Sequence, residues 1–185
     1  MEVLQTTIPD VILFRPRIFN DSRGSFFESY NQNTIKEIGI TQTFVQDNQS
    51  QSARGVLRGL HYQMGEYAQA KLVRVIKGSV FDVAVDIRKN SPTYGQYFGS
   101  VLSEENKLQM FVPRGFAHGF IVLEDETIFA YKCDNYYNKD SEGGIVWNDP
   151  TIKINWQMDT NDILLSEKDE ILPSLSNCKN DFIYA

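Results

Sequence analysis

The segment Val80–Arg88 alternates between two kinds of side chain from one residue to the next. The apolar positions are Phe81, Val83, Val85 and Ile87, and the intervening positions are Asp82, Ala84, Asp86 and Arg88. A period of two is typical of a β-strand with two different faces. The short connection Lys77–Ser79 joins this strand to the apolar run Leu72–Ile76, and its glycine predicts a hairpin turn between them.

Further short runs of this kind recur along the chain, separated by turn residues. They predict strands at Phe98–Leu102, Gln109–Val112, His118–Leu123, Ile128–Cys133 and Gly144–Trp147. Two short segments favour helices, Thr34–Ile38 and Ser103–Leu108, and their candidate N-caps are Asn33 and Ser103. Many short strands with few helices predict an all-β antiparallel sandwich or barrel. Because the chain contains no linker or internal repeat, we expect a single domain over residues 1–185.

The composition narrows the class of protein. A net charge of −6 argues against nucleic-acid binding, which depends on neutralising phosphates. No apolar run approaches the roughly 20 residues of a membrane helix, and the start Met1–Thr7 lacks the pattern of a secretory signal. Cys133 and Cys178 alone do not make a disulfide framework and suit free thiols in a reducing compartment. We therefore expect a cytoplasmic protein that binds neither nucleic acid nor a membrane, and that can still hold a small anion in a locally basic pocket.

The chain contains two histidines, His61 and His118, and both lie in segments that read as the inside of a β-structure. An imidazole has an unperturbed pKa of about 6.5 and is easily set up to move a proton at neutral pH. Apolar residues and glycines flank both histidines, and Arg58, Lys71 and Arg114 lie nearby in the sequence. This pattern predicts a dry pocket that receives an anion and exchanges protons with it.

Proton transfer is a better interpretation of these histidines than metal binding. A catalytic metal site usually has three protein ligands, and the sequence contains no His-x-His pair. A carboxylate such as Asp86 or Asp169 could instead fix the tautomer of one imidazole. Lys71 could stabilise an enolate oxygen, and Tyr131 could return a proton from the opposite wall of the pocket.

Each of these residues also has a purely structural interpretation. A lone histidine in an apolar strand is more often a core residue, a strand tyrosine usually packs, and Lys71 could lay its stem along an apolar surface. Residue spacing alone thus favours an enzyme only slightly over a binding module. Arg58 and His61 are an odd number of residues apart, so they can share one site only if the strand bends or bulges. Gly59 is the candidate for that bulge.

Blocks of sequence around these residues carry a resemblance to a known family. In chain order they are Phe19–Glu28, Gln46–Ser50, Gly55–His61, Gln69–Val75, Val83–Arg88, Ser91–Thr93, Pro113–Phe120, Tyr131–Cys133 and Trp147–Pro150. With these blocks the chain resembles the dTDP-4-dehydrorhamnose 3,5-epimerase family. The resemblance implies a cupin-type β-jelly roll with a few short peripheral helices, a homodimer with an exchanged N-terminal segment, and no metal or other cofactor. Pro113–His118 is similar to the second cupin motif, whereas the His-x-His of the first is missing.

The resemblance also implies a role for individual residues. His61 would be the base, Asp169 would orient it, Lys71 would stabilise the enolate, and Tyr131 would be the acid on the opposite face. The implied substrate-binding residues are Arg23, Phe26, Glu28, Gln46, Asp47, Asn48, Arg58, His118, Glu142 and Lys168. Two of them, Arg23 and Arg58, would grip the diphosphate, as bidentate donors can.

The implied substrate is dTDP-4-dehydro-6-deoxy-D-glucose. Its C4 ketone acidifies the protons on C3 and C5, and inversion of both centres gives dTDP-4-dehydro-L-rhamnose without a redox step. Three alternatives stay open at this point. The protein could be a 3-epimerase or 5-epimerase on a related dTDP-4-keto-6-deoxysugar, a cupin that binds dTDP-sugars without turnover, or a metal-dependent cupin oxygenase.

Overall fold

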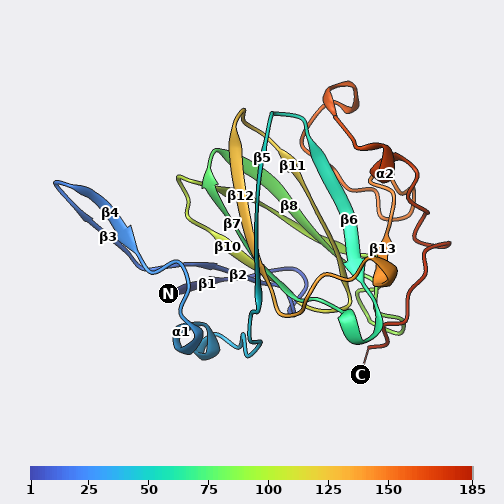
Figure 1. Ribbon diagram of the computed structural model, residues 1–185, viewed down its shortest axis with the longest axis horizontal. Coiled ribbons are helices and arrows are strands. Elements are labelled where there is room, and N and C mark those ends of the chain that lie inside the picture. The colour runs from blue at the N-terminus through green and yellow to red at the C-terminus, as the bar shows by residue number, and fades with distance from the viewer. Residues whose placement is uncertain (185) are drawn as a thin grey trace.

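Two antiparallel β-sheets face each other in the computed structural model, which describes residues 1–184 (Figure 1). Across the six-stranded sheet the order is β1 (Glu2–Leu4), β2 (Ile12–Arg15), β10 (Gln109–Val112), β7 (Lys71–Lys77), β12 (Thr127–Cys133) and β5 (Gln46–Ser52). Across the five-stranded sheet the order is β13 (Glu142–Gly144), β6 (Leu57–Gln63), β11 (Phe116–Val122), β8 (Ser79–Asp86) and β9 (Tyr97–Ser103). The predicted all-β architecture is confirmed.

The remaining elements are short and lie outside these two sheets. They are the hairpin β3 (Ile18–Asp21) and β4 (Gly24–Phe27), the helices α1 (Gln32–Glu37) and α2 (Glu167–Glu170), and the 3₁₀ turns η1 (Gly65–Tyr67), η2 (Lys139–Ser141) and η3 (Thr160–Asp162). The β3–β4 hairpin projects away from the body of the molecule (Figure 1, blue). Among the described residues, no helix combines the length and apolar character needed to cross a membrane.

Strand β8 is buried along its whole length because both faces of the five-stranded sheet are covered. The face with Phe81, Val83 and Val85 packs against residues 145–182, which include Ile145 and Trp156. The opposite face, with Asp82, Ala84 and Asp86, therefore points toward the six-stranded sheet. The apolar face of the alternating pattern thus lies under the C-terminal segment, and the face with the aspartates lies between the sheets.

The six-stranded sheet has a similar cover over part of its outer face. Phe14, Leu72 and Phe111 from its strands pack against Ile35 of α1 and the following Ile40. Burial of such side chains contributes roughly 1.5–3 kcal/mol each. Residues 145–182 thus cover the outer face of one sheet, and the α1 region covers part of the outer face of the other. Polar side chains that are shielded from water can therefore gather between the sheets.

Most predicted elements are confirmed, with shifted ends. The strands predicted at Phe98–Leu102, Gln109–Val112 and Ile128–Cys133 differ from β9, β10 and β12 by one residue or less at each end. Strand β8 ends at Asp86, before the predicted end at Arg88.

Two predictions near the chain's turns are wrong. The helix predicted at Ser103–Leu108 is a turn, because the Asn106 carboxamide accepts hydrogen bonds from the Ser103 and Leu108 backbone N–H groups. The strand predicted at Gly144–Trp147 is also wrong, because β13 ends at Gly144. Ile145 still exchanges two backbone hydrogen bonds with Leu60 of β6, but Val146 N donates to Pro173 O.

The first helix also begins earlier than predicted. Asn31, not Asn33, is the N-cap of α1, and its side chain accepts hydrogen bonds from the Asn33 and Thr34 backbone N–H groups. Asn31 and Asn33 are equally suited to capping by residue type, so the sequence could not separate them.

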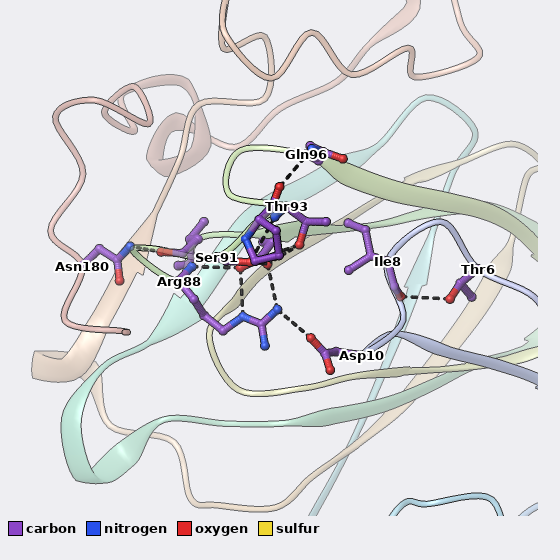
Figure 2. Close-up of polar contacts among 11 residues, drawn as sticks. Thr6, Ile8, Asp10, Arg88, Ser91, Thr93, Gln96 and Asn180 are labelled. Carbon is purple, nitrogen blue, oxygen red and sulfur yellow. Dashed lines mark hydrogen bonds and ion pairs between the residues drawn. The ribbon is translucent and has the colours of Figure 1, made fainter. Parts of the chain in front are cut away.

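Asp86 belongs to a dense polar network at the end of β8. Its fully buried carboxylate accepts hydrogen bonds from the Arg88 backbone and guanidinium, from Ser91 Oγ at 2.6 Å and from Thr93 Oγ1 at 2.7 Å. Burial alone would raise the pKa of Asp86, but these hydrogen bonds outweigh it and hold the pKa below its ordinary value. Arg88 also pairs with Asp10 at 2.8 Å, which ties the N-terminal loop to this network (Figure 2). The interpretation of Asp86 as the orienting partner of a histidine is therefore wrong.

Candidate active site

A cavity of about 480 Å³ opens between the two sheets. Its polar lining residues are Gln49, Ser50, Arg58, His61, Lys71, His118, Tyr131, Ser166, Lys168 and Asp169. Val56, Leu57, Phe120, Leu164 and Leu165 form its apolar walls. The cavity thus brings both histidines, a lysine, a phenol and a carboxylate to one space.

His61 on β6 forms a hydrogen bond with Asp169 on α2. The imidazole Nε2 and the carboxylate Oδ1 are 2.5 Å apart, although the two residues are far apart in the sequence. The Asp169 side chain is 5% exposed and the His61 side chain is 35% exposed, so the carboxylate is the more buried partner of the pair. Burial alone would raise the pKa of Asp169, but the His61 contact and Ser166 hold it below its ordinary value. An ionised Asp169 can therefore fix the orientation of the His61 ring.

His118 forms a second imidazole–carboxylate pair. The register of β11 and β6 places His118 directly opposite His61. Its Nε2 lies 2.9 and 3.0 Å from the two carboxylate oxygens of Asp82 on β8, and its ring stacks on Phe129. Burial lowers the pKa of His118 and raises the pKa of Asp82. The His118 ring therefore lines the cavity, and the buried Asp82 carboxylate holds the ring in place.

Sequence reasoning did not single out Asp82 as a site residue. Its signal was present in the alternating pattern of β8, where Asp82 and Asp86 both occupy the face opposite the apolar one. Nothing in the pattern indicated that this face lies between the sheets.

Lys71 and Tyr131 reach the cavity from the opposite sheet. Lys71 begins β7 and Tyr131 lies on the neighbouring strand β12, with the ammonium Nζ 5.8 Å from the centre of the phenol ring. Burial lowers the pKa of Lys71 and raises the pKa of Tyr131. The imidazoles on one sheet and the phenol on the other thus line opposite sides of the same space.

A bulge in β6 allows Arg58 and His61 to line the same cavity. His118 pairs with His61, whereas Phe120 pairs with Arg58, so β6 has one extra residue in this stretch. Gly59 has a φ of +137°, and a Cβ there would lie 2.6 Å from Gly119 Cα. The predicted bulge at Gly59 is confirmed. Arg58 is held by a hydrogen bond from Nη2 to Ser52 Oγ at 3.2 Å.

The comparison with known proteins decides the family. The family model described as dTDP-4-dehydrorhamnose 3,5-epimerase matches residues 5–177. This chain belongs to the dTDP-4-dehydrorhamnose 3,5-epimerase family. The family member from Shigella flexneri is 56% identical over 170 residues, which cover 91% of this chain and 93% of that protein.

Solved structures of the 3,5-epimerase family have the same fold. The dTDP-4-dehydrorhamnose 3,5-epimerase of Elizabethkingia anophelis matches with a TM-score of 0.91 at 50% identity, over 96% of this chain and 97% of that chain. The dTDP-6-deoxy-D-glucose-3,5-epimerase of Legionella pneumophila, in complex with dTDP-4-keto-L-rhamnose, matches with a TM-score of 0.91 at 48% identity. That match covers 95% of this chain and 93% of the Legionella chain. The cupin-type β-jelly roll implied by the family resemblance is confirmed.

A smaller cavity of about 200 Å³ adjoins the first and contains three more residues implied by the 3,5-epimerase resemblance. Gln46, Asn48 and Glu142 line it together with His61, Lys71 and Tyr131, which the two cavities share. Tyr137 lines it too and was not predicted. The Lys168 ammonium and the Glu142 carboxylate form an ion pair at 2.7 Å.

Other residues implied by the family resemblance lie away from these two cavities. The Asp47 carboxylate pairs with Lys132 at 2.8 Å, and Asp47 does not appear in the described lining of either cavity. This placement follows from strand alternation, because Gln46 and Asn48 point between the sheets and Asp47 points outward. Arg114, noted only for its position near His118, forms an ion pair with Asp134 at 2.9 Å.

Arg23, Phe26 and Glu28 lie on or beside the β3–β4 hairpin. Phe26 is 71% exposed, and the Arg23 guanidinium pairs with Asp21 of the same hairpin at 2.5 Å. Glu28 accepts hydrogen bonds from Asn31 and Thr34. Within residues 1–184, none of the three lines the two cavities of its own chain.

The described residues contain no group of three or more His, Cys, Asp or Glu side chains placed to hold a metal ion. Each imidazole instead directs Nε2 to one carboxylate partner.

Proposed function

We propose that this protein is a dTDP-4-dehydrorhamnose 3,5-epimerase that converts dTDP-4-dehydro-6-deoxy-D-glucose to dTDP-4-dehydro-L-rhamnose. One observation carries the proposal: an imidazole held by a carboxylate and a partly buried phenol line opposite sides of one cavity, on opposite sheets. Inversion of a carbon centre requires removal of a proton from one face and its return on the other. The named relatives, which match over more than nine-tenths of the chain, support this reaction.

In the proposed reaction His61 removes a proton from the carbon next to the ketone. Asp169 holds one ring nitrogen, so the other nitrogen is the one that accepts the substrate proton. The negative charge of Asp169 stabilises the imidazolium that forms, and positioned general bases of this kind typically contribute about 10²–10⁴-fold.

Lys71 and Tyr131 complete the proposed step from the opposite wall. The Lys71 ammonium stabilises the enolate oxygen, an effect of about 10²–10³-fold for a well-placed donor. Burial raises the pKa of Tyr131, so its phenol stays protonated and can donate a proton to the opposite face of the carbon. The ketone itself acidifies the neighbouring C–H bonds, so these residues supply the proposed chemistry without a cofactor.

We further propose a homodimer in which the β3–β4 hairpin completes the site of the partner subunit. A projecting hairpin with an exposed Phe26 and the cation of Arg23 suits a role outside its own subunit. Arg23 would then join Arg58 on the diphosphate of a dTDP-sugar. Gln46, Asp47 and Asn48 would hold the nucleotide, and Glu28 would be a further ligand contact. The domain would span residues 1–185, and the two free thiols, Cys133 and Cys178, suit work in the cytoplasm.

Incubation with substrate in D₂O tests the proposed function. The wild-type protein should incorporate deuterium at both C3 and C5, whereas His61→Ala should bind dTDP with unchanged affinity and show no exchange. Exchange at C3 alone or C5 alone would replace the proposal with a mono-epimerase. Binding without any exchange would indicate a dTDP-sugar-binding protein, and a stoichiometric transition metal in the purified protein would favour the oxygenase alternative.

A further inference from the structure

Asp169 reaches His61 from a segment with little regular structure. We name residues 160–170 the strap; it contains η3 and the four-residue helix α2. The strap runs outside the strands of the five-stranded sheet, at the side where α2 lies in Figure 1. It supplies Asp169 and Lys168 as well as the cavity wall Leu164–Ser166. The orientation of the proposed base therefore depends on where this segment rests against the sheet.

The strap docks on the chain just before and within β6. Leu57 N donates to Leu164 O at 2.9 Å, and Leu164 N donates to Gly55 O at 2.9 Å. These two bonds form a parallel bridge between Val56 and Leu164. Arg54 and Asp162 add a half-exposed ion pair at 3.9 Å, which contributes little to stability.

Gly55 is the point of closest approach. Its φ is +91°, and a Cβ built there would lie 2.3 Å from the carbonyl oxygen of Asp162, closer than real Cβ atoms come to any atom. The neighbour is backbone and cannot rotate away as the end of a side chain can. A side chain at this position would therefore push the strap off the sheet.

A shift at Asp162 would be carried to Asp169 because tight turns lie on both sides of Leu164. Asp159 caps η3 through Asn161 N. The Ser166 Oγ and carbonyl oxygen both accept from Asp169 N, at 3.2 and 2.9 Å. Since a hydrogen bond is lost when its atoms move apart by about 1 Å, a small displacement of the strap is enough to break the His61–Asp169 contact.

We propose that Gly55 is a positioning residue for the epimerisation: its missing side chain sets the position of the strap and thereby the hydrogen bond between His61 and Asp169. The inference rests on the proposed function, because it assigns Gly55 an effect on a step that His61 performs.

Gly55→Ala tests this proposal, with Gly39→Ala as its matched control. Gly39 has a φ of +92°, and the nearest atom to its added Cβ is Ile12 Cδ1 at 3.9 Å. Both variants place a side chain at nearly the same positive φ, but only Gly55→Ala puts a Cβ against the backbone of the strap. We expect kcat to fall about 10²-fold in Gly55→Ala, with KM changed less than threefold and with Gly39→Ala close to wild type. A kcat for Gly55→Ala within twofold of Gly39→Ala would overturn the proposal.

A double-mutant comparison tests whether Gly55 acts through Asp169. In an Asp169→Asn background the orienting carboxylate is already lost, so adding Gly55→Ala should lower kcat no further. If the two losses multiply instead, Gly55 affects the reaction by another route and the proposal is wrong.

Leu164→Pro provides a second variant should Gly55→Ala fail to fold. Leu164 is 54% exposed, and proline removes the N–H that donates to Gly55 O. We expect the same loss of kcat, again absent in the Asp169→Asn background, whereas a wild-type kcat would contradict the proposal.

A readout independent of turnover separates this inference from the proposed function. The hydrogen-bonded ring N–H of His61 should give a downfield proton resonance in the wild type and in Gly39→Ala. It should disappear in Gly55→Ala or Leu164→Pro. If the wild type exchanges no deuterium, the proposed function is wrong. If the resonance is nevertheless lost in Gly55→Ala, the role of Gly55 in positioning the strap still holds. Retention of the resonance would overturn the role of Gly55.

Discussion

Asp82 and Asp86 lie on the same face of β8, both fully buried, yet their surroundings differ sharply. The Asp86 carboxylate accepts from a guanidinium, a backbone N–H and two hydroxyls, and its pKa is below the ordinary value despite burial. Within the described chain, the Asp82 carboxylate has one hydrogen-bond partner, the His118 imidazole, and burial raises the pKa of Asp82.

The two surroundings show how a structural carboxylate differs from a carboxylate that positions a site residue. The partners of Asp86 follow within the next few residues, Arg88 to Thr93, so the network forms wherever this turn forms. The partner of Asp82 comes from another strand and faces a cavity. A buried charge with many donors stabilises the fold, whereas a buried charge with few donors costs stability. We infer that the role of Asp82 is to position the His118 imidazole.

Asp86→Asn should have the largest effect on stability. The substitution leaves the Arg88 guanidinium, whose side chain is 14% exposed, with Asp10 as its remaining acidic partner. Removing one partner of a buried pair typically costs about 3–5 kcal/mol in free energy of unfolding. Urea denaturation measures that loss, and kcat of the folded fraction should stay within threefold of wild type. A loss under about 1 kcal/mol would remove the contrast between the two aspartates.

Asp82→Asn should have the opposite effects, with little change in stability and a large loss of activity. The amide keeps the shape of the side chain and removes a buried charge, so the unfolding free energy should stay equal or rise. The His118 ring loses its charged partner, and we expect kcat/KM to fall about 10²-fold, or about 2.7 kcal/mol. Steady-state kinetics and urea denaturation on the same preparation check both parts. A parallel loss of stability would mean that Asp82, too, is structural.

The pH dependence of stability should separate the two carboxylates by sign. The depressed pKa of Asp86 gives stability that is present above the unfolded pKa of about 3.9 and is lost as the pH falls through the folded value. The raised pKa of Asp82 lowers the free energy of unfolding at pH values above its folded pKa. This loss is relieved as the pH falls through that value. A tenfold difference in proton affinity between the folded and unfolded states corresponds to about 1.4 kcal/mol of stability.

Urea denaturation between pH 3 and pH 7 tests this prediction. The stability deficit of Asp86→Asn should shrink in acid, and any advantage of Asp82→Asn should shrink as well. Differences from wild type that do not change with pH would show that neither carboxylate titrates as described.

Ser91→Ala should have the smallest effect. It removes the donor 2.6 Å from Asp86 but leaves those from Arg88 and Thr93 in place. We expect a loss of about 1 kcal/mol in free energy of unfolding and no change in kcat. A loss as large as that of Asp86→Asn would indicate that the hydroxyls, not the guanidinium, hold the carboxylate.

The sequence predicted the strands better than it predicted their faces. The alternation of Val80–Arg88 identified β8, but the side that faces the cavity depends on residues 145–182, whose packing has no local signal. The helix predicted at Ser103–Leu108 failed because Ser103 and Asn106 cap turns as readily as helices.

The local features of the site were predictable from the sequence, whereas its long-range contacts were not. The parity of Arg58 and His61 was sufficient to place a bulge at Gly59. Residue types alone left Asp86 and Asp169 as equal candidates for orienting a histidine, and the family resemblance favoured Asp169. The pairing of His61 with Asp169 joins residues more than a hundred positions apart, a distance over which periodicity carries no information.

The segment that covers the five-stranded sheet also contains the strap with Asp169. During synthesis, the ribosome therefore releases the cover of the sheet and the partner of His61 almost together. A chain cut or stalled before this stretch would lose catalytic competence and expose apolar strands at the same time. Incomplete copies would then be recognisable to chaperones and proteases before they could bind and retain a nucleotide sugar.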